Sequence, residues 1–269
     1  MDRAAVLTAF NEQVRQATTP DGTGATFEKT ELLVRRLAVP GTDGSGIIWT
    51  DLDESNADPV IAEQLAFFGA RAAEFEWKYY DYDQPADLAG RLARAGLVAE
   101  EPESFVVAEV PVIIAALASA PVPAGITIER VTDPAGVDVM NSVQESVFGE
   151  DRSELRASLL AQLAAAPEMT GLFVAMAGDV PVSAARIEFL PETEFAGLWG
   201  GGTLPEWRGR GIYRELVKHR AELAAERGYK YLTVDASDQS RPILERLGFT
   251  RLAVTTPYIW TPPAPKPAG

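Results

Sequence analysis

Cysteine is absent from this chain of 269 residues, and histidine occurs once, as His219. The lack of thiols excludes disulfides, thiolate zinc sites and cysteine nucleophiles. One histidine is also too few for a histidine-rich metal site or a cysteine–histidine relay. Because His219 stands among charged residues in an expected helix, we predict an exposed side chain there and no metal centre.

Positive charge is scarce, and so are long apolar runs. The chain has 24 Lys and Arg against 39 Asp and Glu, a formal net charge of -15. This charge opposes nucleic acid and anionic membranes, so we expect neither as a partner and instead expect a cationic small-molecule amine as substrate. No uncharged apolar run approaches the roughly 20 residues that cross a bilayer, and Met1–Ala4 begins no secretion signal. We therefore expect a soluble, cytoplasmic protein.

Apolar residues make up 46% of the chain, and its length favours two domains. The spacing of apolar and turn residues predicts alternating helices and strands, which is typical of α/β units. The expected helices span residues 2–17, 58–73, 86–95, 135–148, 151–166, 209–227 and 240–246. The expected strands span residues 31–38, 47–50, 75–80, 104–113, 126–132, 171–177, 180–190, 195–204, 229–236 and 250–260.

A stretch rich in alanine and proline at 116–125 divides this alternation into two halves. We predict one domain over 1–120 and a second over 121–260. The remaining residues, 261–269, include four prolines and are predicted to be disordered.

The two halves resemble each other, which indicates an internal repeat. Residues 75–97 and 229–249 each predict a strand, an Asp-Gln turn, a short helix, and a glycine that enters a last strand. The halves differ at the earlier turn from strand to helix, where the first half has the acidic run Asp51–Asp58. An acidic turn cannot hold a pyrophosphate.

At the corresponding turn, the second half has the basic, glycine-containing run Leu204–Val217. Gly209 and Gly211 allow the backbone to direct several N–H groups to one place, and the helix that begins there adds the positive end of its dipole. This run therefore predicts a phosphate-binding loop in the second half alone.

Arg208–Tyr213 resembles the acetyl-CoA loop of the GCN5-related N-acetyltransferases (GNAT), in which Arg or Gln, two residues, Gly, one residue, and Gly or Ala lie between a strand and a long helix. Ser237–Phe249 is similar to the next block of that family, an Asn-led turn and a short helix that ends in Leu-Gly-Phe. The similarity covers most of 126–260, and the whole chain resembles bacterial tandem members whose amino-terminal copy is degenerate.

This resemblance implies an α/β fold of the mixed-sheet α+β kind: two tandem GNAT-like domains, in which a central mixed sheet with a splayed parallel strand pair is flanked by helices. The pair would be 195–204 and 229–236, with acetyl-CoA as co-substrate in the gap and its pantetheine paired like an added strand. Gly200–Gly202 suit such a close approach, and the alternative for them is a bulged or flexible strand. The expected acetyl-CoA contacts are Thr203, Leu204, Arg208, Gly209, Arg210, Gly211, Ile212, Tyr213, Arg214, Ser237 and Ser240.

Three positions depart from the family pattern. Tyr213 replaces the last Gly or Ala of the loop, Ser237 replaces the leading Asn, and Leu244 replaces a Tyr that in the family often protonates the departing thiolate. The loop tolerates the first change because backbone N–H groups do the binding, but leucine cannot donate a proton. We expect Tyr213, Ser240 or solvent to do so, and prefer Tyr213, whose alternative role is a ring packed between helix and sheet.

Acetyl transfer to an amine also needs a group that takes a proton from the ammonium. The candidates are Asp235, Glu194 and Glu145, and the alternative for each is a surface or ion-pairing carboxylate. Asp235 is preferred because it lies two residues before the Ser237 turn. Family members often have Glu on the central strand, whereas this chain has Phe195–Gly197 there.

Together these observations predict an acetyl-CoA-dependent N-acetyltransferase that moves an acetyl group to a primary amine by direct transfer in a ternary complex. The second half would be active, and the first half would cover apolar surface or line the acceptor cleft. Two alternatives are a non-catalytic acyl-CoA-binding sensor and a dimerising scaffold. Small metabolites, antibiotics and protein amino termini all fit as acceptors.

Overall fold

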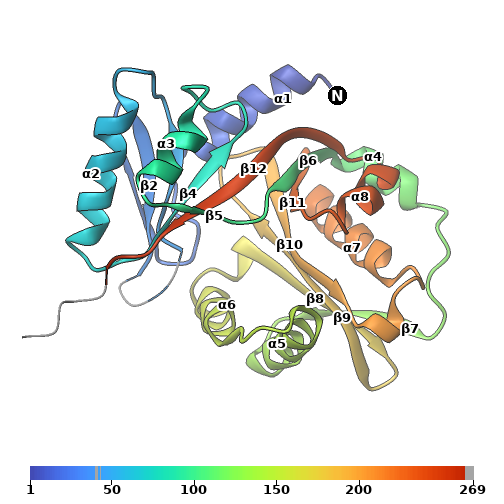
Figure 1. The fold of residues 1–269 in the computed structure, drawn as a ribbon. Coiled ribbons are helices and arrows are strands. Elements are labelled where there is room, and N and C mark those ends of the chain that lie inside the picture. The colour runs from blue at the N-terminus through green and yellow to red at the C-terminus, as the bar shows by residue number, and fades with distance from the viewer. Residues whose placement is uncertain (40–41, 43, 264–269) are drawn as a thin grey trace, which may run out of the picture.

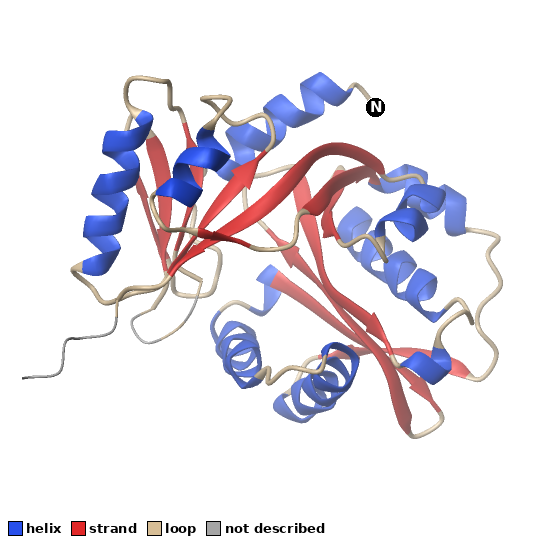
Figure 2. Ribbon diagram, viewed as in Figure 1, coloured by secondary structure: helices blue, strands red, loops and turns tan. Residues whose placement is uncertain are grey.

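A computed structural model describes residues 1–39, 42 and 44–263, and shows one twisted mixed sheet with helices on both faces (Figures 1 and 2). The helices are α1 (Arg3–Phe10), a π-helical continuation η1 (Asn11–Arg15), α2 (Ala57–Gly69), α3 (Leu88–Arg94), α4 (Val110–Leu117), α5 (Pro134–Phe148), α6 (Ser153–Ala165), α7 (Ile212–Glu226), α8 (Arg241–Leu247), and the 3-10 turns η2 (Pro167–Met169) and η3 (Pro205–Trp207). The strands are β1 (Thr26–Lys29), β2 (Leu33–Leu37), β3 (Gly46–Thr50), β4 (Phe75–Tyr80), β5 (Val98–Ala99), β6 (Glu103–Glu109), β7 (Ile126–Val131), β8 (Thr170–Ala177), β9 (Val180–Phe189), β10 (Phe195–Thr203), β11 (Tyr231–Ala236) and β12 (Thr250–Trp260).

The sheet contains the same motif twice. Its strand order is β1-β2-β3-β4-β12-β6-β11-β10-β9-β8-β7, and β5 pairs with β12. The pairs β3/β4 and β10/β11 are parallel. Each pair is connected by a long helix, α2 or α7, and is followed by a short helix, α3 or α8, and a last strand, β6 or β12. This repetition confirms the predicted fold class, a tandem arrangement with a mixed sheet.

The last strand of each half is exchanged with that of the other half. β6 comes from the first half but pairs with β11, from Tyr231 opposite Glu109 to Ala236 opposite Ser104. β12 comes from the second half but pairs with β4, and Figure 1 shows it crossing to the first half. β6 and β12 also pair with each other and so join the halves into one sheet. The division at 120/121 stays a prediction, and this sheet crosses it.

Side-chain alternation along β10 separates the two faces of the sheet near the predicted site. Ala196 and Leu198 pack in the core beneath α7, whereas Phe195 packs with Phe10 of α1 on the opposite face. Arg186 of β9 also points to that opposite face, where it approaches Gln144 of α5. α7 therefore covers one face, and α1 and α5 cover the other.

Most helices and strands lie where the sequence predicted them, but β1, the two-residue strand β5, the helix α4 and the 3-10 turns η2 and η3 were not predicted. β1 was not predicted, because its four residues carry almost no buried apolar side chain. The strand expected over 104–113 ends at Glu109, and the chain continues as α4. Pro111 fits the first turn of a helix, where no N–H is needed, and Ile113 and Leu117 are buried on one face of it. Of the predicted disordered tail, 264–269 lie outside the described residues.

Candidate active site

The parallel strands β10 and β11 separate after their first three residues. Phe195–Gly197 pair with Tyr231–Thr233, and no later pair joins the two strands within the described part of the chain. Beyond Thr233, β6 is the only strand among the described residues that pairs with β11. The facing edges of the two strands thus carry backbone groups that an extended ligand can pair with. This geometry confirms the predicted splayed pair.

A β-bulge lies in β10 where the strands have separated. The register with β9 shifts between Trp199 and Gly202, and Gly200 has a left-handed backbone with φ of 58°. A Cβ atom at Gly200 would lie 2.5 Å from Gln144 Nε2, and one at Gly201 would lie 2.8 Å from Cε2 of Tyr213. The glycines therefore permit the close approach of the chain's own helices, in agreement with the bulged-strand alternative.

Two buried polar side chains, which were not predicted from the sequence, bond from opposite faces to the bulge and to the neighbouring residue of β9. Gln144 Nε2 of α5 donates to the carbonyl of Gly200 at 2.9 Å. On the other face, Arg220 Nη1 of α7 donates to the carbonyl of Arg186 at 3.2 Å. Burial lowers the pKa of Arg220 to about 10, so the guanidinium stays charged at neutral pH. In each case, a polar residue on an otherwise apolar helix face was the sequence feature that could have indicated a buried hydrogen-bonding role.

The predicted phosphate loop begins where β10 ends and leads through η3 into α7. Gly209 and Gly211 have φ of 76° and 85°, a conformation that favours glycine, and Gly211 is the N-cap of α7. No acceptor among the described residues receives a hydrogen bond from the N–H groups of 209–214. Since these groups stand at a helix N-terminus, they suit an anion such as a pyrophosphate.

Several arginine side chains around this loop already contact other groups of the chain. Arg208 Nε donates to the Thr203 carbonyl at 3.0 Å, and the guanidinium of Arg210 lies over Trp207. Arg214 Nη2 donates to the Pro121 carbonyl at 3.1 Å. Arg208 and Arg210 are nevertheless exposed, so their charges remain available to a phosphate. Thr203 bonds to Ser183, the Leu204 N–H donates to Val182, and the Ile212 side chain is buried.

The first half has already filled the equivalent position with its own carboxylate. Between β3 and α2, Asp53 Oδ1 accepts from the N–H groups of Ser55 and Asn56 at 2.7 and 3.0 Å. Hydrogen bonds, first from the Ser55 hydroxyl and then from these amides, lower the pKa of Asp53. Because an ionised carboxylate already occupies these amides, the turn of the first half is unfavourable for a phosphate.

The block after β11 forms a tight turn and a short helix. Ser237 begins the turn, and its carbonyl accepts from Arg241 N–H at 2.9 Å; the Ser240 hydroxyl also lies within 3.3 Å of that carbonyl. Leu244 is 0% exposed and packs in the core beneath α7. The position where similar proteins often have a tyrosine is thus filled by a core residue.

Asp235 is the proton-acceptor candidate that the structure places beside the splayed strands. It lies two residues beyond the last paired residue of β11, Thr233, and on the face opposite α7, since Leu232 and Ala236 occupy the α7 core. Its Oδ2 is 3.0 Å from Nζ of Lys78, a partner from the first half that the sequence did not reveal.

The structure does not bring Glu194 to this place, and it bonds Glu145 to another residue of α5. Glu194 precedes β10, at the end of the strand remote from the loop, and pairs with Lys230. Glu145 accepts from Asn141 Nδ2 at 2.8 Å within α5. Tyr213 has the alternative role given above, a ring packed between helix and sheet. The ring packs on Gly201, its hydroxyl interacts with Arg220, and burial raises the pKa of that hydroxyl.

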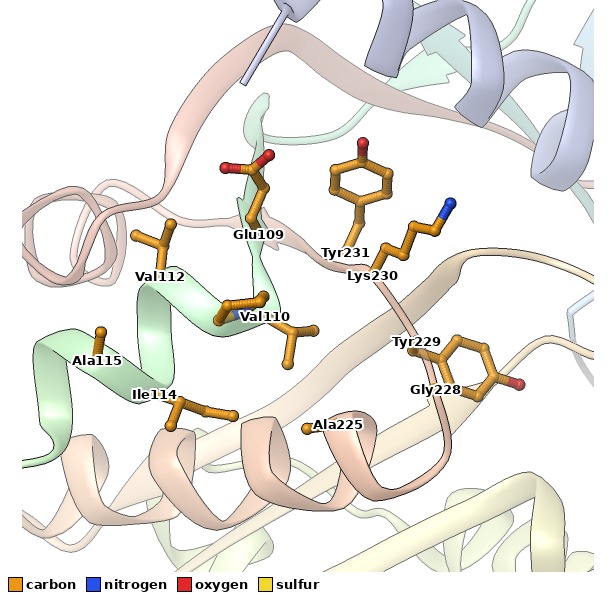
Figure 3. Close-up of a pocket in the computed structure, with 11 residues that line it drawn as sticks. Glu109, Val110, Val112, Ile114, Ala115, Ala225, Gly228, Tyr229, Lys230 and Tyr231 are labelled. Atoms are coloured by element: carbon orange, nitrogen blue, oxygen red, sulfur yellow. The ribbon is translucent and has the colours of Figure 1, made fainter.

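An open apolar groove of about 700 Å³ lies elsewhere, at the amino-terminal end of β11. Figure 3 shows Val110 and Ile114 of α4 on one side of it, and Ala225 and Tyr229 on the other. Since β10 and β11 are parallel and the phosphate loop follows β10, this groove is at the opposite end of the strands from the loop. It is not the cleft between the splayed strands.

Within the described residues, no group of three or more His, Asp or Glu side chains is arranged to bind a metal ion. No helix in that same part of the chain is both long and apolar enough to span a membrane.

Comparison with known proteins agrees with this geometry. Residues 137–249 match the model of the acetyltransferase (GNAT) family. These residues, which include the bulged strand, the loop and the block after β11, therefore belong to that family. Its members are acetyltransferases, so transferase is the class of activity that the match supports.

Solved structures extend the similarity of fold to the whole chain. A GCN5-related N-acetyltransferase from Kribbella flavida has a TM-score of 0.69 and 16% identity, over 100% of this chain and 96% of its own. A tandem GNAT protein from the clavulanic acid biosynthesis pathway has a TM-score of 0.63 and 12% identity, over 96% and 93%. A GCN5-related N-acetyltransferase from Sphaerobacter thermophilus has a TM-score of 0.56 and 15% identity, over 88% and 75%. No curated protein sequence matches. The chain thus has the tandem GNAT fold.

Proposed function

We propose that this protein is an acetyl-CoA-dependent N-acetyltransferase that transfers an acetyl group directly to a positively charged primary amine while both substrates are bound. The observation that carries the proposal is the run of N–H groups at 209–214, which lack acceptors in the described residues and lie at the open end of the splayed strands. The second half holds the reaction site, and the first half contributes strand β6.

The residues present fit acetyl-CoA. The N–H groups of 209–214 would hold its pyrophosphate, with charge from Arg208, Arg210 and Arg214. The unpaired edges of β10 and β11 would pair with its pantetheine, near Ser237 and Ser240. When bound, acetyl-CoA supplies a thioester whose acetyl carbon an amine can attack.

Asp235 would then act as the base. Lys78 holds one carboxylate oxygen, Oδ2, whereas Oδ1 is buried and has no hydrogen-bond partner in the described part of the chain. Oδ1 can accept a proton from the ammonium group of the acceptor, which frees the nitrogen lone pair for attack. The departing thiolate would take its proton from Ser240 or from solvent, because Leu244 has no proton to give and the Tyr213 hydroxyl faces Arg220.

Leu244 also supports a second candidate, a sensor that binds acyl-CoA without catalysis. Both functions need the loop, but only the enzyme releases free thiol when an amine is added. The rate of thiol release from acetyl-CoA with a panel of amines separates them, since a sensor would stay at the background rate.

The binding proposal is tested by Gly211→Asp. A side chain at φ of 85° is strained, and the new carboxylate would occupy the place of the phosphate. The matched control is Gly178→Asp, which has φ of 61° and open space around it in the β8–β9 turn, and so adds the same charge with comparable strain. We expect Gly211→Asp alone to weaken acetyl-CoA binding by about a hundredfold or more, the loss of two charge-assisted hydrogen bonds. Calorimetry on protein with an unchanged circular dichroism spectrum measures this. Equal affinity in the two variants would contradict the proposal.

A further inference from the structure

A second cavity, of about 600 Å³, lies between the two halves of the chain at the carboxyl end of β11. One wall is the segment that leads into β6, with Glu100, Glu101 and Glu103. The other wall is the turn after β11, with Ser237, Asp238 and Gln239. The exchange of β6 creates this cavity, since it brings a loop of the first half beside the turn that ends the second half's splayed strand.

The cavity has a strong negative charge. Four of its lining residues are acidic, and no Lys or Arg from the described part of the chain lines it. Two cations lie nearby: Lys78 Nζ is 3.9 Å from Glu103, and Arg241 is 3.5 Å from Asp238. Each of these cations is shared with another carboxylate, so the acidic charge of the cavity is only partly neutralised.

Asp235 connects this cavity to the reaction site. Its side chain is 9% exposed, and Oδ1 is buried without a hydrogen-bond partner among the described residues. One residue, Ala236, separates it from Ser237, which lines the cavity. Asp235 and the cavity residue Glu103 also share Lys78, at 3.0 and 3.9 Å. Asp235 thus has a buried acceptor oxygen without a donor among the described residues, and it lies beside the lysine that it shares with the cavity residue Glu103.

We propose that this cavity binds a second positively charged group of the acceptor, so that the substrate is a diamine or polyamine with one ammonium at Asp235 and another among Glu100, Glu101 and Glu103. This inference rests on the proposed function and specifies its substrate class. It also gives the first half a role: its loop forms the wall that recognises the acceptor.

The raised pKa of the Glu103 carboxyl, which lines the cavity, agrees with a cationic ligand. Burial raises the pKa of Glu103 to about 7, more than Lys78 lowers it, and the charges of Asp235 and Glu76 raise it further. Burial likewise raises the pKa of Glu76. An ammonium group in the cavity would stabilise the ionised form of Glu103, which lines it. Binding of a diamine should therefore tighten as the pH rises from about 6 to about 8.

The test compares two acceptors of equal chain length, 1,4-diaminobutane and n-butylamine, with acetyl-CoA and the full chain. We expect kcat/KM to be at least about tenfold higher for the diamine, which is the ratio that one charge-assisted hydrogen bond provides. Glu101→Gln combined with Glu103→Gln should abolish that preference. The matched control Glu129→Gln, at an exposed position of β7, should retain it. Equal kcat/KM for the two amines, or a preference that survives the double substitution, would overturn the inference and leave the proposed function intact.

If neither amine is acetylated, calorimetry with 1,4-diaminobutane still decides the site. Binding that the double substitution weakens about tenfold, and that Glu129→Gln does not, would support the cavity and count against the transferase proposal alone. No binding to the unsubstituted protein would overturn the cavity proposal.

Discussion

The strand exchange predicts that the second half does not fold without part of the first. A fragment of residues 120–269 contains the whole family match but lacks β6 and α4. It therefore loses Val106 of β6 and Val110, Ile113 and Leu117 of α4, all at most 1% exposed in the core beneath α7. At about 1.5–3 kcal/mol for each buried side chain, the loss is about 6–12 kcal/mol. Since a domain is stable by only about 5–15 kcal/mol, this fragment should not fold.

A longer fragment, residues 103–269, provides the matched comparison. It keeps β6 beside β11 and α4 against the core, and β12 can still pair with β6 through 250–255. We expect a cooperative urea transition by circular dichroism for 103–269 and none for 120–269. If 120–269 unfolds cooperatively with the stability of the longer fragment, the exchanged strand is not needed and the reasoning is wrong.

Three further predictions concern single side chains. Asp235→Asn should lower the rate of amine-dependent thiol release by about a hundredfold and leave the acetyl-CoA dissociation constant unchanged, because the base is lost and the phosphate loop is intact; an unchanged rate would rule out Asp235 as the base. Gln144→Leu leaves the Gly200 carbonyl without its donor, so the free energy of unfolding, measured in urea, should fall by about 1–3 kcal/mol. The turnover rate should fall more than the affinity for acetyl-CoA. Equal stability of the variant and the unsubstituted chain would show that the bulge does not need the Gln144 side chain. Burial raises the pKa of Glu103 from 4.5 to about 7, so between these pH values the folded chain keeps a proton that the unfolded chain releases. The free energy of unfolding should therefore fall as the pH rises through this range. Urea titrations at about pH 5 and pH 8 should show a smaller fall for Glu103→Gln than for the unsubstituted chain, and an identical fall would refute the assignment.

The phosphate loop was predictable from sequence because its information is local. Gly209, Gly211 and the helix that follows fix the direction of the N–H groups within a few residues. The acidic turn of the first half was equally readable, although the structure adds the reason: Asp53 itself binds the amides. The prediction of a strand over 110–113 was wrong, because these residues begin the helix α4. Val110–Ile114 is rich in β-branched residues, which favour strands, and the preference of proline for the first turn of a helix was not applied to Pro111.

The rest of the site depends on contacts between residues distant in sequence. β6 and β12 are equivalent strands of two similar halves, and nothing in their local pattern states which half each will join. The exchange decides that Lys78 meets Asp235, so this pair could not be predicted before the sheet order was known. Gln144 and Arg220 were missed for a related reason, since polar residues in helices usually face solvent.

The central claim is that the loop at 209–214 holds acetyl-CoA for transfer to an amine. The most direct measurement is the rate of thiol release from acetyl-CoA by the full chain, with and without 1,4-diaminobutane, together with mass spectrometry of the amine. We expect amine-dependent thiol release above the background rate and an N-acetylated product, and we expect Gly211→Asp to lose both. Tight acetyl-CoA binding, with no amine in a broad panel able to increase thiol release, would contradict it.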